Sequence, residues 1–294
     1  MKIVIVGAGF GGLRLARKLN NKPGIEVVLI DRFNHHQFQP LFYQVATAAL
    51  NGSDISFPLR KVFHNSKNVS VRLAELSQIN AADNTVVTSE GNFAYDQLVI
   101  ATGADTNFFG NSNFEKFAWP MKSTVEAMEI RNHILKNFEA ALMEADVLHR
   151  QRLLNIVVVG AGPTGVELSG AIAEMKKYVL PKDYPELDFE AMNIYLLEGG
   201  LKTLAAMSEK SRLQSKNYLE RLGVKVKTNA MMQDYNGKTV FLADGSSIES
   251  SMVIWAAGIK GNIPTGIDAS LIVRGNRIKV NLQCKVEGTK NIYS

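Results

Sequence analysis

Cysteine is almost absent from this chain. Its 294 residues include only Cys284, which excludes an internal disulfide and the cysteine pair that thiol–disulfide chemistry and cysteine-based sulfide oxidation require. A lone thiol also suits a reducing compartment, so we interpret the chain as cytoplasmic. No cysteine-rich or histidine-rich pattern predicts a metal site. The adjacent His35 and His36 would point in different directions in an extended segment, and we interpret them as loop or packing residues.

Long apolar runs and basic clusters are missing as well. No apolar stretch reaches the ~20 residues of a membrane-spanning helix, and the glycines near the N-terminus fit a first strand and phosphate turn better than a signal peptide. The net charge of +5 is small and favours an ordinary solvated surface, with a weakly basic face for anionic lipid as the alternative. No Lys/Arg cluster is interleaved with aromatic residues, so we expect no nucleic-acid binding.

What the chain does contain is one glycine pattern in two copies, VIVGAGFGG and IVVVGAGPTG, each after a short apolar run. In a strand–turn–helix unit the first glycine permits a tight turn, the second lets the backbone approach a pyrophosphate, and the third lets helix and strand pack closely. The helix N-terminus then offers free N–H groups to the phosphates. The glycines are Gly7, Gly9 and Gly12 in the first copy and Gly160, Gly162 and Gly165 in the second. Two such turns indicate two dinucleotides and electron transfer between them.

Each glycine pattern is followed by an acidic residue at a strand end. Asp31 ends the run EVVLID 19 residues after Gly12, the spacing expected of a carboxylate that binds ribose hydroxyls. Glu198 ends NIYLLE 33 residues after Gly165, and the longer gap includes KDYPELDF, which we interpret as an insertion. The alternatives are a turn-forming Asp and a solvated strand-end Glu. A carboxylate at Glu198 would repel a 2′-phosphate and favour NADH over NADPH, a preference that Lys202 weakens slightly.

The repeat extends beyond the glycines. Residues 69–103 and 224–258 both predict short alternating strands, a polar turn, an apolar strand and a terminal glycine. The first glycine precedes that terminal glycine by 96 residues in one half (Gly7 to Gly103) and by 98 in the other (Gly160 to Gly258). An internal repeat of a nucleotide-binding unit is the simplest explanation.

Two amphipathic helices are predicted outside the glycine motifs. The segment that starts at Met121 has a capping box, Ser123 and Glu126, and a helical period that places four apolar residues on one face: Val125, Met128, Ile134 and Phe138. The second helix covers Ser208–Leu222 and is stopped by Gly223. Because no low-complexity linker separates the halves, we expect packed domains.

Four segments give the chain a resemblance to a known family. They are DRFNHHQFQPLFYQVATAAL from Asp31, AWPMKSTVEAMEIRNHIL from Ala118, VVVGAGPTGVELSGAIAE from Val157 and VIWAAGI from Val253. These strings resemble type II NADH dehydrogenases, the single-subunit NADH:quinone oxidoreductases. The match runs along nearly the whole chain, and its Phe-Gln-Pro-Leu and Gly-Pro-Thr-Gly-Val-Glu strings are specific within the wider class of flavoproteins.

This resemblance implies an α/β fold with two Rossmann-like dinucleotide-binding domains, of the glutathione-reductase-like flavoprotein type. The implied domains are residues 1–117, which form the first part of an FAD-binding domain, 118–268, which bind NADH, and 269–294, which return toward the FAD domain. The implied FAD site comprises Gly7, Ala8, Gly9, Gly11, Gly12, Asp31, Arg32, Gln39, Gln44, Ala101, Thr102 and Gly103. Pro40 would lie beside Gln39 near the isoalloxazine. The implied NADH site comprises Gly160, Gly162, Pro163, Thr164, Gly165, Glu198 and Gly258.

The implied activity is hydride transfer from NADH to FAD and electron transfer on to a membrane quinone, without proton pumping, in the respiratory chain. The cofactors carry this chemistry, and the protein supplies geometry and electrostatics. Glu167, two residues after Gly165, is the one candidate catalytic residue, because the resemblance places it where it could deliver a proton to the quinone. The alternative is an acid that complements the positive start of the helix.

The chain also departs from the family, since it ends at KNIYS. The family continues with a Gly-Asp pair at the flavin, a quinone-site motif and an amphipathic membrane anchor. We therefore expect a C-terminally truncated chain that is soluble as a fragment, whereas the intact protein would lie on the cytoplasmic side of the inner membrane. A homodimer is a further family expectation. Two alternatives stay open: a soluble NADH-dependent reductase that serves a ferredoxin-like protein, and a non-catalytic NADH-binding fragment.

Overall fold

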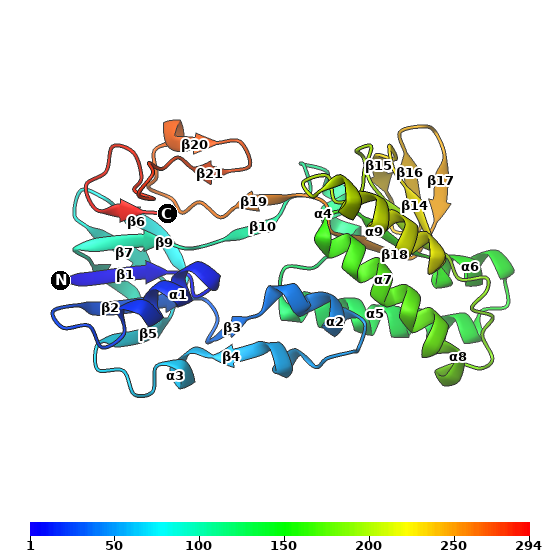
Figure 1. Ribbon diagram of the computed structural model, residues 1–294, viewed down its shortest axis with the longest axis horizontal. Coiled ribbons are helices and arrows are strands. Elements are labelled where there is room, and N and C mark those ends of the chain that lie inside the picture. The colour runs from blue at the N-terminus through cyan, green and yellow to red at the C-terminus, as the bar shows by residue number, and fades with distance from the viewer. The chain divides into compact units, whose positions relative to one another are not determined.

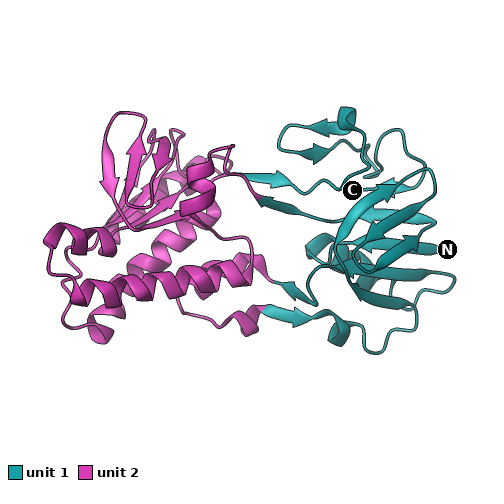
Figure 2. Ribbon diagram, turned by 180° about the vertical axis from the view of Figure 1, so that it is seen from behind, with its two compact units in different colours: residues 1–37, 56–105, 259–294 teal, residues 38–55, 106–258 magenta.

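The computed structural model describes residues 1–294 as two compact units. Unit 1 contains Met1–Gln37, Ser56–Asp105 and Ile259–Ser294, and unit 2 contains Phe38–Ile55 and Thr106–Gly258. Figure 2 colours the two units separately. None of the helices combines the length and the apolar character that crossing a lipid bilayer demands.

Unit 1 is built on a five-stranded parallel sheet in the order β22-β9-β1-β2-β5 (Figure 1). Its strands are β1 (Lys2–Val6), β2 (Glu26–Asp31), β5 (Val69–Leu73), β9 (Gln97–Ile100) and β22 (Ile292–Tyr293). One face carries the antiparallel strands β6 (Leu76–Asn80), β7 (Thr85–Thr88) and β8 (Gly91–Ala94), and the other carries helix α1 (Phe10–Leu19). Side chains of β1 alternate between the two faces, because Ile3 and Ile5 pack with α1 whereas Val4 and Val6 pack on the opposite side.

Unit 2 repeats this plan. Its parallel sheet has the order β11-β18-β12-β13-β14, formed by β11 (Trp119–Pro120), β12 (Ile156–Val159), β13 (Ile194–Leu197), β14 (Val224–Lys227) and β18 (Met252–Trp255). The antiparallel strands β15 (Met232–Tyr235), β16 (Thr239–Leu242) and β17 (Ser247–Glu249) cover one face. The opposite face packs against α2 (Phe42–Ala46), α5 (Thr124–Met143), α7 (Pro163–Tyr178) and α9 (Glu209–Arg221). The predicted internal repeat is therefore confirmed strand by strand.

The remaining elements are short. In unit 1 they are β3 (His35–Gln37), β4 (Ser56–Pro58), α3 (Leu59–Val62), β19 (Ile259–Gly261), η3 (Ala269–Leu271), β20 (Ile272–Val273) and β21 (Arg277–Ile278). In unit 2 they are η1 (Gln39–Leu41), η2 (Gly52–Ile55), α4 (Ser112–Phe117), α6 (Val147–Leu154) and α8 (Leu180–Asp183). Strand β10 (Ala104–Thr106) ends at the start of unit 2. The predicted insertion between α7 and β13 includes α8 and anchors itself with the buried Leu187 and Phe189.

The helix predicted after Met121 is α5, and its start is confirmed. Ser123 accepts a hydrogen bond from the backbone N–H of Glu126 (3.1 Å), while the Glu126 carboxylate accepts one from the N–H of Lys122 (2.6 Å). The predicted apolar face is wrong in part, because Val125 and Met128 are exposed. The buried face is formed instead by Thr124, Ala127, Ile130, Ile134, Asn137, Phe138 and Ala141. Helix α9 also agrees with its prediction, with Ser208 as N-cap and Gly223 after its end.

The boundaries of the units differ from the segments expected from the sequence. Residues 38–55 and 106–117 belong to unit 2, although they precede the second glycine pattern, and residues 259–268 belong to unit 1. The reason is packing: Phe42, Val45 and Ala46 of α2 share one hydrophobic core with α5 and α7.

Candidate functional site

The glycines of the first turn are of two kinds, with crowded or open surroundings. Gly7 has φ +104°, and a Cβ built on it would lie 2.1 Å from the carbonyl oxygen of Ala101. A Cβ on Gly12 would lie 1.8 Å from the carbonyl oxygen of Gly7, so α1 can approach the turn only without a side chain there. Around Gly9 and Gly11, by contrast, a Cβ would meet nothing within 4 Å. The turn is therefore tight at its first and last glycines and open at the middle, as a pyrophosphate cradle requires.

The second turn has the same geometry. Gly160 has φ +100° and lies against Ala256 and Ala257, and a Cβ on Gly165 would lie 1.9 Å from the carbonyl oxygen of Gly160. The middle glycine, Gly162, again faces open space. Pro163 starts α7, where its missing N–H costs no helical hydrogen bond and its fixed φ favours the first turn. Each unit thus ends a buried parallel strand in an open turn that leads into a helix N-terminus.

One carboxylate closes each turn through the same backbone group. Asp31 Oδ2 accepts a hydrogen bond from the N–H of Ala8 (2.6 Å), and Glu198 Oε2 accepts one from the N–H of Ala161 (2.8 Å). The other oxygen of each acid accepts from the residue two positions later, Phe33 (2.7 Å) or Gly200 (2.7 Å). Both acids remain partly exposed, so their oxygens can also accept from hydroxyl groups of a ligand.

The other residues predicted for the first site fall into two groups. Arg32 is exposed, with its guanidinium 5.1 Å from the ring centre of Phe33. Ala101 abuts Gly7, and Thr102 donates from Oγ1 to the carbonyl oxygen of Asn262 (2.5 Å) before Gly103, which has φ +69°. These residues share unit 1 with the glycine turn.

Gln39 and Gln44 lie instead in unit 2. Gln39 is exposed at the start of η1, beside Pro40, and Gln44 lies on α2 and donates from Nε2 to the hydroxyl of Tyr43 (3.0 Å). These two residues therefore belong to the same unit as α5 and α7.

In unit 2 the predicted residues Pro163, Thr164 and Gly258 follow the carboxyl ends of β12 and β18. Gly258 has φ +83°, and a Cβ built on it would lie 2.5 Å from the ring of Phe109. Sequence reasoning missed Phe109, which is 67% exposed and itself has a positive φ of 53°. The sequence gives no signal for it, because its positive φ is known only from the structure.

Sequence reasoning also missed the role of His36. This side chain is buried, and its Nδ1 donates a hydrogen bond to the carbonyl oxygen of Ala8 (2.9 Å). In unit 2 the equivalent carbonyl oxygen, that of Ala161, accepts a hydrogen bond from the backbone N–H of Leu204 instead (2.8 Å). The interpretation of His35 and His36 as packing residues is right for His36, which in addition stacks edge-on with Phe10 at 5.1 Å.

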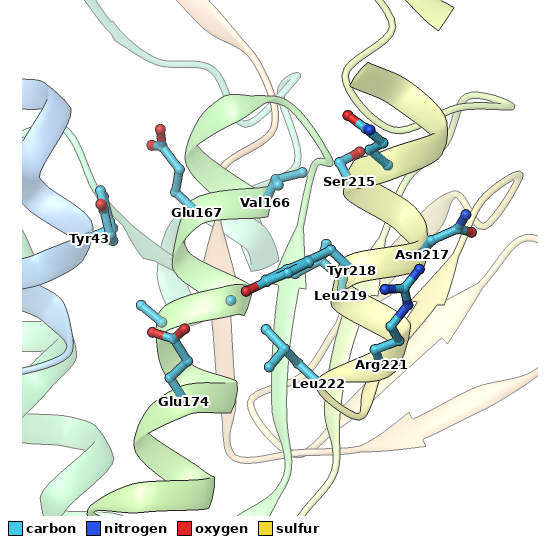
Figure 3. Close-up of a pocket in the computed structure, with 13 residues that line it drawn as sticks. Tyr43, Val166, Glu167, Glu174, Ser215, Asn217, Tyr218, Leu219, Arg221 and Leu222 are labelled. Atoms are coloured by element: carbon cyan, nitrogen blue, oxygen red, sulfur yellow. The ribbon is translucent and has the colours of Figure 1, made fainter. Parts of the chain in front are cut away.

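Glu167 is the fifth residue of α7 and lies just beyond the first turn, although the alternative interpretation placed it as an acid at the positive start of this helix. It lines a cavity of about 610 Å³ between α7 and α9 in unit 2 (Figure 3). The cavity is lined by Tyr43, Val166, Glu167, Gly170, Ala171, Glu174, Gln214, Ser215, Asn217, Tyr218, Leu219, Arg221 and Leu222. Figure 3 shows Glu167 on the side of α7 that faces Tyr43, and the Tyr218 hydroxyl near Glu174. Desolvation raises the pKa of Glu167 although the side chain keeps contact with solvent.

Comparison with known proteins agrees with this geometry. The model of the pyridine nucleotide-disulphide oxidoreductase family matches residues 1–294, and the chain belongs to this family. It does so without a cysteine pair, since Cys284 is its only cysteine.

Within this family the chain is similar to type II NADH:quinone oxidoreductases. It is 37% identical to NdhA and 36% identical to Ndh, both type II NADH:quinone oxidoreductases of Mycobacterium tuberculosis, with 99% of this chain covered in each case. The chain spans 65% of the length of each of these relatives. Among solved structures, NDH2 from Plasmodium falciparum superposes with a TM-score of 0.90 at 25% identity, over 99% of this chain and 62% of that one. The predicted fold class is confirmed.

The contrast between the middle and last glycines gives a first prediction. Gly9→Val should leave the free energy of unfolding within about 1 kcal/mol of wild type, because the added side chain meets open space, but should abolish dinucleotide binding to unit 1. Gly12→Ala is the matched variant, and its Cβ clash with Gly7 should destabilise unit 1 by roughly 2–4 kcal/mol. Urea unfolding and bound-flavin content measure the two effects. Equal stability of both variants would contradict the assigned roles.

A second prediction concerns pH. Burial raises the pKa of Glu167 above its ordinary value of 4.5, so the folded chain holds this proton more tightly than the unfolded chain, and the stability that Glu167 contributes is lost as the pH rises from 4.5 through the folded pKa. Glu167→Gln should therefore lose less stability than wild type between pH 4 and pH 7. Urea unfolding at both pH values measures this, with the exposed Glu129→Gln as control. A wild-type pH dependence in Glu167→Gln would refute the desolvation.

Proposed function

We propose that this chain is the nucleotide-binding part of a flavoprotein that transfers a hydride from NADH to FAD. One observation carries the proposal. Each unit has a glycine turn at the start of a helix, with free space beside its middle glycine and a hydrogen bond from its alanine N–H to a strand-end carboxylate. A single turn of this kind is common, but two in one chain suit a protein that handles two dinucleotides. The similarity to type II NADH:quinone oxidoreductases supports the same function.

In this proposal unit 1 holds FAD. The N–H groups at the start of α1 and the open space at Gly9 and Gly11 suit the pyrophosphate, and Asp31 accepts hydrogen bonds from the adenosine ribose. Thr102 and Gly103 pass near the flavin phosphates, and Gln39, Pro40 and Gln44 lie near the isoalloxazine, as the resemblance implies. The residues fit the cofactor, because side chains are missing at the positions where a pyrophosphate would need backbone contact.

Unit 2 then binds NADH through Gly160, Gly162, Pro163, Thr164 and Gly165. Glu198 takes the ribose, and Gly258 lies on the nicotinamide side. The Glu198 carboxylate is negatively charged and lies where NADPH would place its 2′-phosphate, so charge repulsion favours NADH over NADPH. The segments expected from the sequence are 1–117 for the FAD part, 118–268 for the NADH part and 269–294 for the return to the FAD part. The proposed division follows the two units instead, with residues 38–55 and 106–117 in unit 2 and 259–268 in unit 1.

When bound, FAD accepts two electrons with the hydride and can pass them to a further acceptor. The chain contributes binding, orientation and proton handling. The amides of the two glycine turns fix the phosphates, and the paired acids fix the riboses. Glu167 holds a proton at its carboxylate more readily than an ordinary glutamate does, which suits a group that delivers protons to a reduced acceptor.

For the longer protein we propose a membrane quinone as the acceptor, since the relatives from Mycobacterium tuberculosis are NADH:quinone oxidoreductases by name. This oxidation would pump no protons. The protein would lie on the cytoplasmic face of the inner membrane, attached through a C-terminal region that follows the family's pattern, and would form a homodimer.

The proposal is tested by a visible spectrum of the purified chain. We expect flavin bands that bleach when NADH is added without oxygen, because hydride from unit 2 must reduce a flavin in unit 1. Gly9→Val, which should not bind flavin, is the control. A chain without flavin, or with flavin that NADH cannot reduce, would rule out the oxidoreductase and leave an NADH-binding fragment.

Glu198 gives a separate prediction on coenzyme choice. Glu198→Gln keeps an oxygen to accept from Ala161 but removes the negative charge, so the NADH/NADPH ratio of dissociation constants should move toward NADPH by roughly tenfold. Nucleotide fluorescence titration measures both constants. Glu209→Gln, which removes an exposed carboxylate at the start of α9, should leave the ratio unchanged. If the NADH/NADPH ratio of dissociation constants in Glu198→Gln also stays constant, Glu198 does not bind the adenosine ribose.

A further inference from the structure

Positive charge is concentrated near the end of unit 1. Residues 259–294 contain six Lys or Arg and only two acidic residues, a net charge of +4 within a chain whose total is +5. One of the acids, Glu287, is paired with Lys279 at 2.8 Å, and the other, Asp268, caps η3 by accepting from Ser270. Most of the remaining cations of this segment are exposed to solvent.

Three of these cations belong to one small structure. Strands β20 and β21 form an antiparallel hairpin in which Val273 lies opposite Arg277, with Arg274 at the start of the turn (Figure 1). The turn is fastened to β19, because Gly261 donates from its N–H to the carbonyl oxygen of Gly275 (2.9 Å) and Asn276 donates from Nδ2 to that of Gly261 (2.8 Å). Lys260 of β19 is therefore held beside the hairpin turn.

Aliphatic side chains accompany these cations without being buried. Ile259 is 60% exposed, Val273 43% and Ile272 36%. We call this set the hairpin surface; it comprises Ile259, Lys260, Ile272, Val273, Arg274 and Arg277. Two acidic residues lie close to this surface in the fold: Asp268, the cap of η3 just before β20, and Asp105 on β10, the strand paired with β19. A hairpin that carries exposed aliphatic groups together with cations has the composition that favours the interface of an anionic membrane.

The same unit offers a basic surface without this composition. Arg14, Arg17 and Lys18 are exposed on α1, but the apolar side chains Leu13, Leu15 and Leu19 of that helix pack against the sheet. Helix α1 covers one face of the sheet, whereas Leu271 and Ile278, next to the hairpin surface, pack on the other. Two equal groups of three cations thus lie on opposite faces of one sheet, and only one has exposed aliphatic neighbours.

We propose that the hairpin surface docks this chain onto an anionic lipid bilayer, with its cations at the headgroups and its aliphatic side chains in the interface. This contact lies in the nucleotide-binding part itself and is additional to any C-terminal anchor. The inference rests on the membrane location proposed above. Its test uses lipid binding alone, so it can fail while the flavin spectrum still confirms hydride transfer, and the converse also holds.

The experiment is flotation of the 294-residue chain with phosphatidylcholine vesicles that contain phosphatidylglycerol. Wild type should float with these vesicles, less so at high salt because the charges are screened, and should not float with phosphatidylcholine alone. The triple variant Lys260→Gln, Arg274→Gln, Arg277→Gln should bind roughly 100-fold more weakly, since each cation near such a surface contributes about a factor of five to ten. The α1 variant Arg14→Gln, Arg17→Gln, Lys18→Gln loses the same charge and should bind like wild type.

The aliphatic contribution is tested separately with Ile259→Ser and Val273→Ser together. This variant keeps every charge and should bind roughly tenfold more weakly than wild type. Unchanged thermal unfolding and NADH binding show that each variant is folded. Three results would overturn the proposal: wild-type binding by the hairpin variants, an equal loss in the α1 variant, or retention of the chain by immobilised polyglutamate without any flotation, which would indicate an acidic protein as the partner.

Discussion

The hydrogen bond between a strand-end carboxylate and the amide of the alanine between two glycines is the interaction on which both sites depend. It connects the end of one parallel strand to the turn that follows its neighbour, through Asp31 and Ala8 in unit 1 and through Glu198 and Ala161 in unit 2. A charged acceptor makes this bond stronger than a neutral one. It fixes the open part of the turn before a nucleotide arrives, so binding does not have to order the loop. The carboxylate that we propose binds the ribose thereby also shapes the glycine turn.

Much of this arrangement could be predicted from the sequence, because its causes are local. The glycine spacing, the alternating strands of residues 69–103 and 224–258 and the cap at Ser123 each depend on neighbours within a few residues. The buried face of α5 could not be predicted in full. Val125 and Met128 fit a helical period as well as Ala127 and Ile130 do, and the choice between the two faces depends on which neighbours pack there. His36 was equally out of reach, since its partner Ala8 lies 28 residues away.

Residues 38–55 show a different limit. Their position in the chain, between the first glycine turn and β5, suggests membership of the first domain, yet α2 buries Phe42, Val45 and Ala46 in the core of unit 2. Composition and periodicity cannot predict that a segment of the chain packs into the core of the other unit. It has a chemical consequence, because the glutamines expected near the flavin, Gln39 and Gln44, are held by the unit that carries the second glycine turn.

The two turns also differ in a way that matches the proposed division between a resident cofactor and an exchangeable substrate. After Asp31 come Arg32 and Phe33, whose side chains contact one another. After Glu198 come Gly199 and Gly200, which leave that position without side chains. The backbone bonds are the same, since the residue two positions after each acid donates to it. In the proposed division, Arg32 and Phe33 would cover the ribose of the resident cofactor, and the two glycines would leave the ribose of NADH uncovered.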